Sequence, residues 1–258
     1  MHTGGGSRGG VVPFLTGTVV SAVAYQLVFG SRSQVFGSFP FAGPGDRLEV
    51  ALTFDDGPNE PYTSQLLDTL DDRGVPATFF QVGRCAERFP DVTRRVVAEG
   101  HVLGNHSLSH SMARYLSDPD QQREVVGGRE VLQQIAGVSP ALYRPPWLCH
   151  WPWVLRGIAS TGSAVVSGTF GSLLEVAQPP ARRITADSAR RARPGAVLIL
   201  HDGREARGGP RAQTVASVGP LVDVLRTRGY RFTTVDRLLG VPAYREAPTY
   251  GGAVAGGT

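Results

Sequence analysis

Short hydrophobic runs alternate with stretches of helical periodicity over most of this chain. The runs after Leu48 are rich in β-branched and aromatic residues, which is typical of strands. They fall at Val50–Phe54, Ala77–Val82, His101–Leu103, Ala141–Tyr143, Ala164–Val166, Ala196–Leu200 and Arg231–Val235. Between them, recurring apolar positions predict helices at Thr63–Asp72, Pro90–Glu99, Pro119–Ile135, Pro152–Ala159, Arg182–Ala192 and Val215–Arg228. This alternation predicts an α/β fold with a parallel sheet, arranged as a distorted (β/α)7 barrel in a single domain.

The region before this predicted domain has a different pattern, because no charged residue occurs between Arg8 and Arg32. An apolar segment that ends in the small residues Ala22 and Ala24 has the proportions of an export signal. If it continues to Phe29, it approaches the roughly 20 residues needed to cross a membrane. We therefore expect residues 1–24 to be a signal-like or membrane-anchor segment. The folded domain would then be secreted or membrane-anchored outside the cytoplasm, with a buried helix as the alternative.

Residues 25–47 are expected to form an N-terminal extension. Two apolar runs, at residues 25–29 and 34–39, flank a polar Gly-Ser-Arg-Ser segment and predict a short hairpin. The folded domain is expected over residues 48–240, and the glycine-rich residues 241–258 are expected to be a flexible tail.

Composition narrows the possible partners. With 258 residues, of which 41% are hydrophobic, the chain can build one large core. Its 26 basic residues are all arginine and are scattered rather than clustered, which indicates no nucleic-acid partner. Cys85 and Cys149 are too few for a disulfide scaffold, and the sequence leaves open whether they pair. It gives no indication of oligomeric state.

Two adjacent carboxylates end the first predicted strand. Asp55 and Asp56 follow a buried apolar run and precede a Gly-Pro turn. Neighbouring like charges at the end of a buried strand are unfavourable, so such a pair is retained mainly where it binds a cation or moves a proton. An acidic surface turn is the alternative, because Asp-Gly-Pro is also an ordinary turn sequence.

Polar residues follow later strands too, at the strand ends where parallel α/β barrels build their sites. His106 and His110 follow the third predicted strand, and a spacing of four places two imidazoles on one face of a helical turn. Asp56 is the natural third ligand if the two histidines bind a metal ion. The alternative is that the two histidines are a chance pair on an exposed helix. His101 is expected to be structural, and His150 to pack in the core or at its rim.

Arg144 and His201 also follow predicted strands. A guanidinium in the apolar context of Arg144 is unfavourable unless it meets a carboxylate, and Asp55 is the expected partner. A surface arginine in a proline-stiffened loop is the alternative. His201 emerges from a buried strand and is either a core histidine or a general acid.

Taken together, these motifs resemble the polysaccharide deacetylase family, the carbohydrate esterases of family 4 with the NodB homology domain. The matching segments are Thr53–Pro58, His106–His110, Arg144–Pro146 and Leu198–Gly203, and the resemblance spans roughly residues 48–240. It implies a metal-dependent hydrolase that removes acetyl groups, above all N-acetyl groups, from a glycan such as peptidoglycan or chitin-like oligomers.

The resemblance also implies roles for individual residues. Asp56, His106 and His110 would bind a divalent metal, with Zn²⁺ expected and Co²⁺ as the alternative. Asp55 would be the general base that takes a proton from the attacking water. His201 would protonate the departing amine.

Further roles concern the surroundings of this chemistry. Arg144 would hold Asp55 in its charged and correctly aimed form, and a backbone N–H near Trp147 would stabilise the oxyanion. Trp147, Pro146 and Glu175 are the residues assigned to the substrate region. The ring of Trp147 suits a sugar face, although a tryptophan there is equally compatible with the core.

One motif departs from the family pattern. Relatives commonly carry an Asp-rich segment after the fifth strand whose acid supports the catalytic histidine, and here Glu175 is the only acid available. Glu175 is therefore a candidate partner of His201, or the histidine is tuned in another way. This departure bears on the substrate class and the efficiency more than on the type of reaction.

Two other readings compete with the N-deacetylase. One is a non-catalytic glycan-binding relative, and the other is an O-acetyl esterase of the acetylxylan type. The presence of both Asp55 and His201 beside a complete ligand set favours an enzyme, because a binding protein needs no base and acid together.

Overall fold

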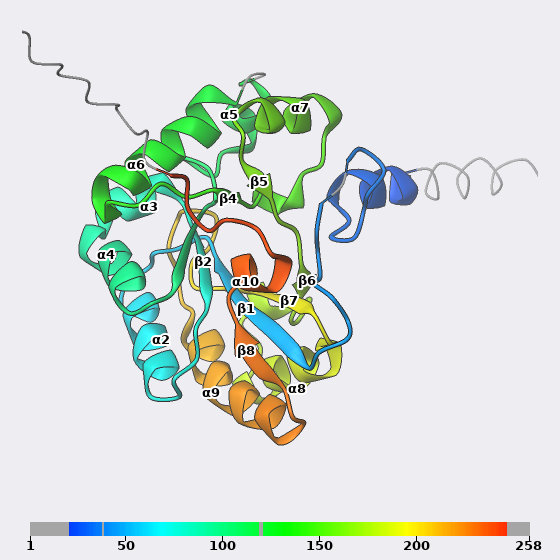
Figure 1. The fold of residues 1–258 in the computed structure, drawn as a ribbon, viewed down its shortest axis with the longest axis vertical. Helices are drawn as coiled ribbons and strands as arrows, with labels where there is room; N and C mark the ends of the chain where they lie inside the picture. Colours follow the sequence, from blue (N-terminus) through cyan, green and yellow to red (C-terminus); the bar gives the residue numbers. More distant parts are fainter. Residues whose placement is uncertain (1–20, 38, 119–120, 247–258) are drawn as a thin grey trace, which may run out of the picture.

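The computed structural model describes residues 21–37, 39–118 and 121–246, and at its centre is one sheet of eight strands (Figure 1). The strands are β1 (Glu49–Asp55), β2 (Thr78–Gln81), β3 (Val102–Asn105), β4 (Leu142–Tyr143), β5 (Ala164–Val165), β6 (Thr169–Phe170), β7 (Ala196–His201) and β8 (Arg231–Thr233). Seven of them run in the order β5-β4-β3-β2-β1-β7-β6, and every pairing in the sheet is parallel. β8 pairs with the first residues of β1.

Helices surround this sheet. They are α2 (Tyr62–Asp71), α3 (Gly83–Arg88), α4 (Pro90–Ala98), α5 (Met112–Leu116), α6 (Gly127–Ala136), α7 (Pro152–Ser160), α8 (Ala181–Arg191), α9 (Ala212–Thr227) and α10 (Val235–Leu239). A π-helical turn occurs at Gln122–Val126, and 3₁₀ turns occur at Pro146–Leu148 and Glu175–Ala177. Helices α8, α9, α2, α4 and α6 contact one another in that order around the sheet. The predicted distorted (β/α)7 barrel in a single domain is thereby confirmed.

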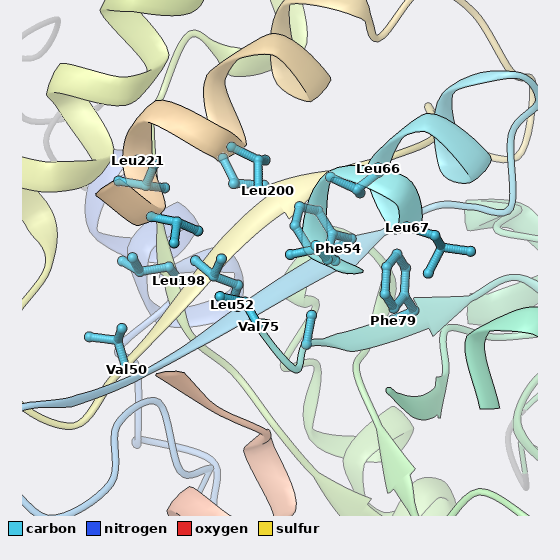
Figure 2. Close-up of a cluster of buried hydrophobic side chains, with 14 of the residues drawn as sticks. Val50, Leu52, Phe54, Leu66, Leu67, Val75, Phe79, Leu198, Leu200 and Leu221 are labelled. Atoms are coloured by element: carbon cyan, nitrogen blue, oxygen red, sulfur yellow. The ribbon is translucent and has the colours of Figure 1, made fainter. Parts of the chain in front are cut away.

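The alternation of side chains along β1 decides which residues pack and which reach the interior of the barrel. Val50, Leu52 and Phe54 point towards the surrounding helices, where they join Leu198 and Leu200 of β7 in the main core (Figure 2). Because successive residues of a strand face opposite sides, the residues between them face the inside. Ala51 lies in a second cluster there, and Thr53 and Asp55 share its face.

Two glycines let the ends of β1 and β7 approach each other. A Cβ atom on Gly57 would lie 2.0 Å from Asp202 Oδ2, and one on Gly203 would lie 2.3 Å from the carbonyl oxygen of Asp56. Both distances are far below van der Waals contact, so neither position has room for a side chain. The Asp-Gly sequences after β1 and β7 therefore serve the close approach of the two strand ends.

The sequence pattern located most of the sheet but missed some elements. Each predicted strand overlaps an observed one, yet β6, which is only two residues long, was not predicted. The strand predicted at Arg231–Val235 is β8, which lies beside β1 and not on the seven-strand path. The short helices α3, α5 and α10 were missed because each is too short to show a period.

The predicted N-terminal hairpin is wrong. Residues 21–29 are helical, and no strand occurs within the described part of residues 25–39. The residues read as a first strand are apolar because Val28 and Phe29 pack on the domain. Most of the predicted signal or anchor segment, residues 1–20, lies outside the described residues. Among the residues that are described, no helix has both the length and the hydrophobicity to span a membrane.

The beginning of the predicted flexible tail is attached to the domain. The Ala141 N–H donates to the carbonyl of Ala243 at 2.9 Å, and the Arg245 N–H donates to that of Ser139 at 2.9 Å. The Tyr244 hydroxyl accepts a hydrogen bond from the Leu103 N–H at 3.1 Å. Residues 241–246 therefore continue the fold, whereas residues 247–258 lie outside the described part of the chain.

Candidate active site

Carboxylates and histidines gather in one pocket at the carboxyl ends of three strands. Asp55 and Asp56 come from the end of β1, His106 and His110 from the loop after β3, and His201 from the end of β7. They line a cavity of about 230 Å³. Parallel strands bring their carboxyl ends to one edge of a sheet, which is where α/β proteins place their sites.

Asp56, His106 and His110 form a compact and buried set of potential metal ligands. Asp56 Oδ1 lies 3.3 Å from His106 Nε2 and 3.0 Å from His110 Nε2. Burial alone would raise the pKa of the Asp56 carboxyl, but hydrogen bonds with the two histidines outweigh it and hold this pKa well below its usual range. Two imidazoles and one carboxylate are a donor set that catalytic zinc sites use.

Neighbouring groups orient these ligands for a cation. His106 Nδ1 lies 2.7 Å from the carbonyl oxygen of Arg144 and donates its N–H to it, so Nε2 is the nitrogen that faces the cluster, where a cation would replace the proton shared with Asp56. Asp56 Oδ2 accepts the N–H of Glu205 at 2.8 Å, which leaves Oδ1 for the cluster. The three ligand atoms lie within 4.8 Å of one another. The residues present therefore fit a divalent metal ion.

The two histidines do not share a helical turn, so that part of the prediction is wrong. Residues 106–110 form an irregular loop, in which Ser107 (φ 73°) and His110 (φ 49°) have left-handed backbone conformations. The Ser107 hydroxyl accepts the N–H of His110 at 2.9 Å. Asp56 is also left-handed (φ 76°). Strained backbone of this kind persists where the surrounding structure enforces it, commonly at functional sites.

Asp55 does not join the ligand cluster but forms an ion pair with Arg144. Its Oδ1 lies 2.7 Å from Arg144 Nη1, and Arg144 is completely buried. Burial lowers the pKa of the guanidinium, whereas the charge and hydrogen bond of Asp55 act in the opposite direction. The same Nη1 donates to Thr53 Oγ1 at 2.6 Å. Thr53 and Asp55 can both accept a hydrogen bond from Arg144 Nη1 because their side chains face the inside of the barrel.

The rest of the Arg144 guanidinium is also satisfied. Nη2 donates to the carbonyl of Ser167 at 3.0 Å, Nε donates to that of Val166 at 3.4 Å, and the guanidinium carbon lies 4.1 Å from the centre of the Phe80 ring. A buried cation is tolerated when its donors and its charge are matched in this way.

His201 is paired with Glu175. His201 Nδ1 lies 2.6 Å from Glu175 Oε2, and Thr214 donates its hydroxyl to the other oxygen of Glu175. Burial would lower the pKa of His201, but the charge and hydrogen bond of Glu175, together with the charges of Asp56 and Asp55, raise it to about 9. Burial likewise works against ionised Glu175, yet His201 lowers the pKa of this carboxyl. The pair is therefore an imidazolium with a carboxylate at neutral pH.

The segment after β4 supplies part of the pocket wall. Trp147 lines the pocket, and its ring lies edge-on to that of His110, with centroids 4.3 Å apart. Pro145 and Leu148 line the same pocket. Pro146 and Glu175, which the sequence assigned to the substrate region, are buried and are not among its lining residues. Glu175 reaches the site only through His201.

The other two histidines that the structure describes, His101 and His150, do not line this pocket, and neither do the two cysteines. His101 is buried, and its Nδ1 accepts the N–H of Ala77 at 3.1 Å. His150 is buried and stacks on Phe39, with ring centroids 4.8 Å apart. Cys85 and Cys149 are both buried and free, so they do not pair.

Several residues at the site were not predicted from the sequence. The alternation along β1 places Thr53 on the face of Asp55, which is a signal that could have identified it. Glu205 contributes a backbone N–H, which no residue type reveals. Tyr25 and Phe29 line the pocket from the N-terminal helix, where a hairpin had been expected.

Comparison with known proteins identifies relatives of this arrangement. The family profile described as polysaccharide deacetylase matches residues 42–166. A peptidoglycan-N-acetylglucosamine deacetylase of Bacillus cereus is 32% identical over 198 residues, which cover 77% of this chain and 70% of the relative.

Solved structures agree with this assignment. A peptidoglycan N-acetylglucosamine deacetylase in complex with 4-naphthalen-1-yl-N-oxidanyl-benzamide is 31% identical, with a TM-score of 0.73 over 80% of this chain and 95% of the other. A family 4 acetyl xylan esterase from Clostridium thermocellum, in complex with a cobalt ion, is 33% identical, with a TM-score of 0.66 over 76% of this chain and 93% of the other. The fold, the pocket and these similarities lead to one conclusion: the chain belongs to the polysaccharide deacetylase family, the carbohydrate esterases with the NodB homology domain, and is a hydrolase of that family.

Proposed function

We propose that this protein hydrolyses N-acetyl groups of an acetylated glycan, such as peptidoglycan or chitin-like oligomers, with a divalent metal ion as cofactor. The observation that carries the proposal is that three groups of side chains with different chemistry meet at one pocket. These are the Asp56 cluster with its two histidines, the Asp55–Arg144 pair and the His201–Glu175 pair. Hydrolysis of an amide needs a bound electrophile, a base and an acid, and each of the three can supply one of them.

Asp56, His106 and His110 are the residues that would hold the metal, for which we propose Zn²⁺. Bound there, a divalent ion supplies a Lewis acid that lowers the pKa of water towards about 7 and polarises a carbonyl group. The cobalt ion in the related acetyl xylan esterase makes Co²⁺ the alternative.

Asp55 acts as the general base in this proposal. One of its oxygens is held by Arg144 at 2.7 Å, which fixes the direction of the carboxylate, and the residue lines the pocket. Asp55 takes a proton from the water that attacks the acetyl carbon. Arg144 is buried and does not line the pocket, so it positions Asp55 and does not touch the substrate.

His201 acts as the general acid. Its raised pKa keeps it protonated at neutral pH, as a proton donor must be. When the C–N bond breaks, His201 donates its proton to the departing nitrogen, and the products are acetate and a free amino sugar. Glu175 positions the His201 ring and stabilises its positive charge. The backbone near Trp147 is the proposed donor to the oxyanion, and the Trp147 ring is a proposed sugar contact.

An O-acetyl esterase is the second candidate, because the related acetyl xylan esterase shares the fold at 33% identity. The protonated state of His201 favours the N-acetyl substrate, since an amine is a poor leaving group unless its nitrogen receives a proton. An alcohol leaving group depends less on receiving a proton. A non-catalytic glycan-binding protein has no use for both the Asp55–Arg144 and the His201–Glu175 pair.

We further propose that the protein works outside the cytoplasm, secreted or attached to the membrane through its N-terminal segment. The apolar residues 11–24 and the peptidoglycan named for its Bacillus cereus relative support this location.

The purified protein loaded with Zn²⁺ is expected to release acetate from chitin oligomers or peptidoglycan. Removal of the metal with a chelator should abolish the release, and added Zn²⁺ or Co²⁺ should restore it, because the metal ion is the Lewis acid of the reaction. Acetate is measured by a coupled enzymatic assay. Absence of acetate release from these substrates, from acetylxylan and from an aryl acetate would refute the proposed hydrolase.

The two adjacent aspartates are expected to respond differently to mutation. Asp55→Asn should keep the metal and lose about 10²- to 10⁴-fold in kcat, because it removes the base and leaves the ligands. His106→Ala should lose both metal and turnover. Metal content is measured by elemental analysis after dialysis. An equal loss of metal in the two variants would contradict this division of roles.

Glu175→Gln is expected to lower the pKa of His201 from its value of about 9, because it removes the largest of the charges that oppose desolvation. Since the acid must be protonated, the alkaline limb of the kcat/KM profile should move to lower pH. The His201 ring can be titrated by NMR in the metal-free protein, with Glu130→Gln on the exposed side of α6 as the control. An unchanged His201 pKa in Glu175→Gln would count against the pairing.

A further inference from the structure

The N-terminal helix supplies part of the catalytic pocket although it precedes the region that matches the family profile. Tyr25 and Phe29 line the same cavity as Asp55, His110 and His201. The family profile begins at residue 42. The helix therefore contributes to the site two residues that lie outside the segment matched by the family profile and outside the motifs described above.

The helix is attached firmly to the domain. Val28 is 8% exposed and belongs to a hydrophobic cluster with Tyr143, Cys149 and Leu155. The N–H of His150 donates to the Val28 carbonyl at 2.7 Å, which ties the last turn of the helix to the segment before α7. These contacts fix the position of the neighbouring pocket residues.

The chain that follows the helix is attached close to the catalytic ion pair. The Ser167 hydroxyl donates to the Ser31 carbonyl at 2.5 Å, and the Ser167 N–H donates to the Pro40 carbonyl at 2.9 Å. The carbonyl of the same Ser167 accepts a hydrogen bond from Arg144. The N-terminal extension is thus connected through one residue to the group that holds Asp55.

Tyr25 differs from the other aromatic residues of the pocket in its exposure. Tyr25 is 60% exposed, and the centroid of its ring lies 5.2 Å from that of Phe29, which is partly buried. An aromatic face left open to solvent on the wall of a catalytic pocket is a surface for a ligand with an apolar face and polar edges. A pyranose ring of a glycan has this character.

The size of the cavity indicates which part of the glycan Tyr25 meets. At about 230 Å³, the cavity is smaller than the usual range of pockets for drug-sized ligands, so we assign it to a single acetylated sugar. Further sugars of the chain must then lie at its rim. The most exposed aromatic residue of the lining, Tyr25, is placed to meet one of them.

We propose that Tyr25, backed by Phe29, is a specificity-determining residue that stacks on a sugar ring next to the acetylated unit. The inference rests on the proposed function, since it takes a glycan as the substrate. It assigns to the N-terminal helix a role in selecting oligomers over single sugars.

The test compares wild type with Tyr25→Ala, Tyr25→Trp and Val23→Ala on N-acetylglucosamine oligomers of two to four units. Tyr25→Ala should raise KM for the tetramer about 3- to 10-fold with little change in kcat, because stacking on a non-reacting sugar contributes uniform binding. Tyr25→Trp should retain the wild-type KM. Val23→Ala is the matched control, because Val23 is 51% exposed on the same helix and does not line the pocket.

The outcomes separate this inference from the proposed function. Equal KM values for Tyr25→Ala and Val23→Ala would overturn the role of Tyr25 while leaving the deacetylase intact. A wild-type protein that releases no acetate would refute the deacetylase, and the tetramer would then serve as a ligand in equilibrium binding measurements. In that case, unchanged affinity of Tyr25→Ala for the tetramer would overturn the inference, and a 3- to 10-fold loss would support it.

Discussion

The buried ion pair between Arg144 and Asp55 is the interaction on which the arrangement of this site depends. Arg144 has no contact with bulk water, so its charge and donors must be matched by protein groups. Its partners come from β1, from β2 and from the chain after β5, and its own carbonyl holds His106. Arg144 therefore fixes the carboxylate on β1 through its side chain and one of the histidine ligands through its backbone carbonyl. Loss of one partner from such a buried pair typically destabilises a fold by about 3–5 kcal/mol.

The ion pair also accounts for the different environments of two adjacent aspartates. Alternation along β1 turns Asp55 to the inside, where Arg144 occupies one of its oxygens. Asp56 follows with a left-handed backbone (φ 76°), which redirects its side chain to the two histidines. The close approach of Gly203 to the Asp56 carbonyl leaves little freedom to this turn. Asp55 and Asp56 are adjacent in sequence but therefore contact different partners.

The sequence predicted the strand ends and the residues that meet there because both follow from short-range patterns. Apolar runs marked β1, β3 and β7, and the parallel arrangement brought Asp56, His106 and His201 together. The helical turn predicted for the histidine pair failed because Ser107 and His110 adopt left-handed conformations, which propensity does not indicate. The role of residues 25–29 was missed because an apolar pentapeptide fits a strand and a packed helix equally well. Backbone partners such as the Glu205 N–H have no signal in residue type.

The most direct test of this account is the position of the metal ion. A crystal grown with Zn²⁺ and measured at wavelengths on both sides of the zinc absorption edge locates the ion by its anomalous scattering. We predict one ion bound by Asp56, His106 and His110, with ligand distances of about 2.0–2.2 Å, and Asp55 still paired with Arg144. An ion ligated by Asp55, or a site at which Arg144 has released Asp55, would contradict the division of roles between the two aspartates.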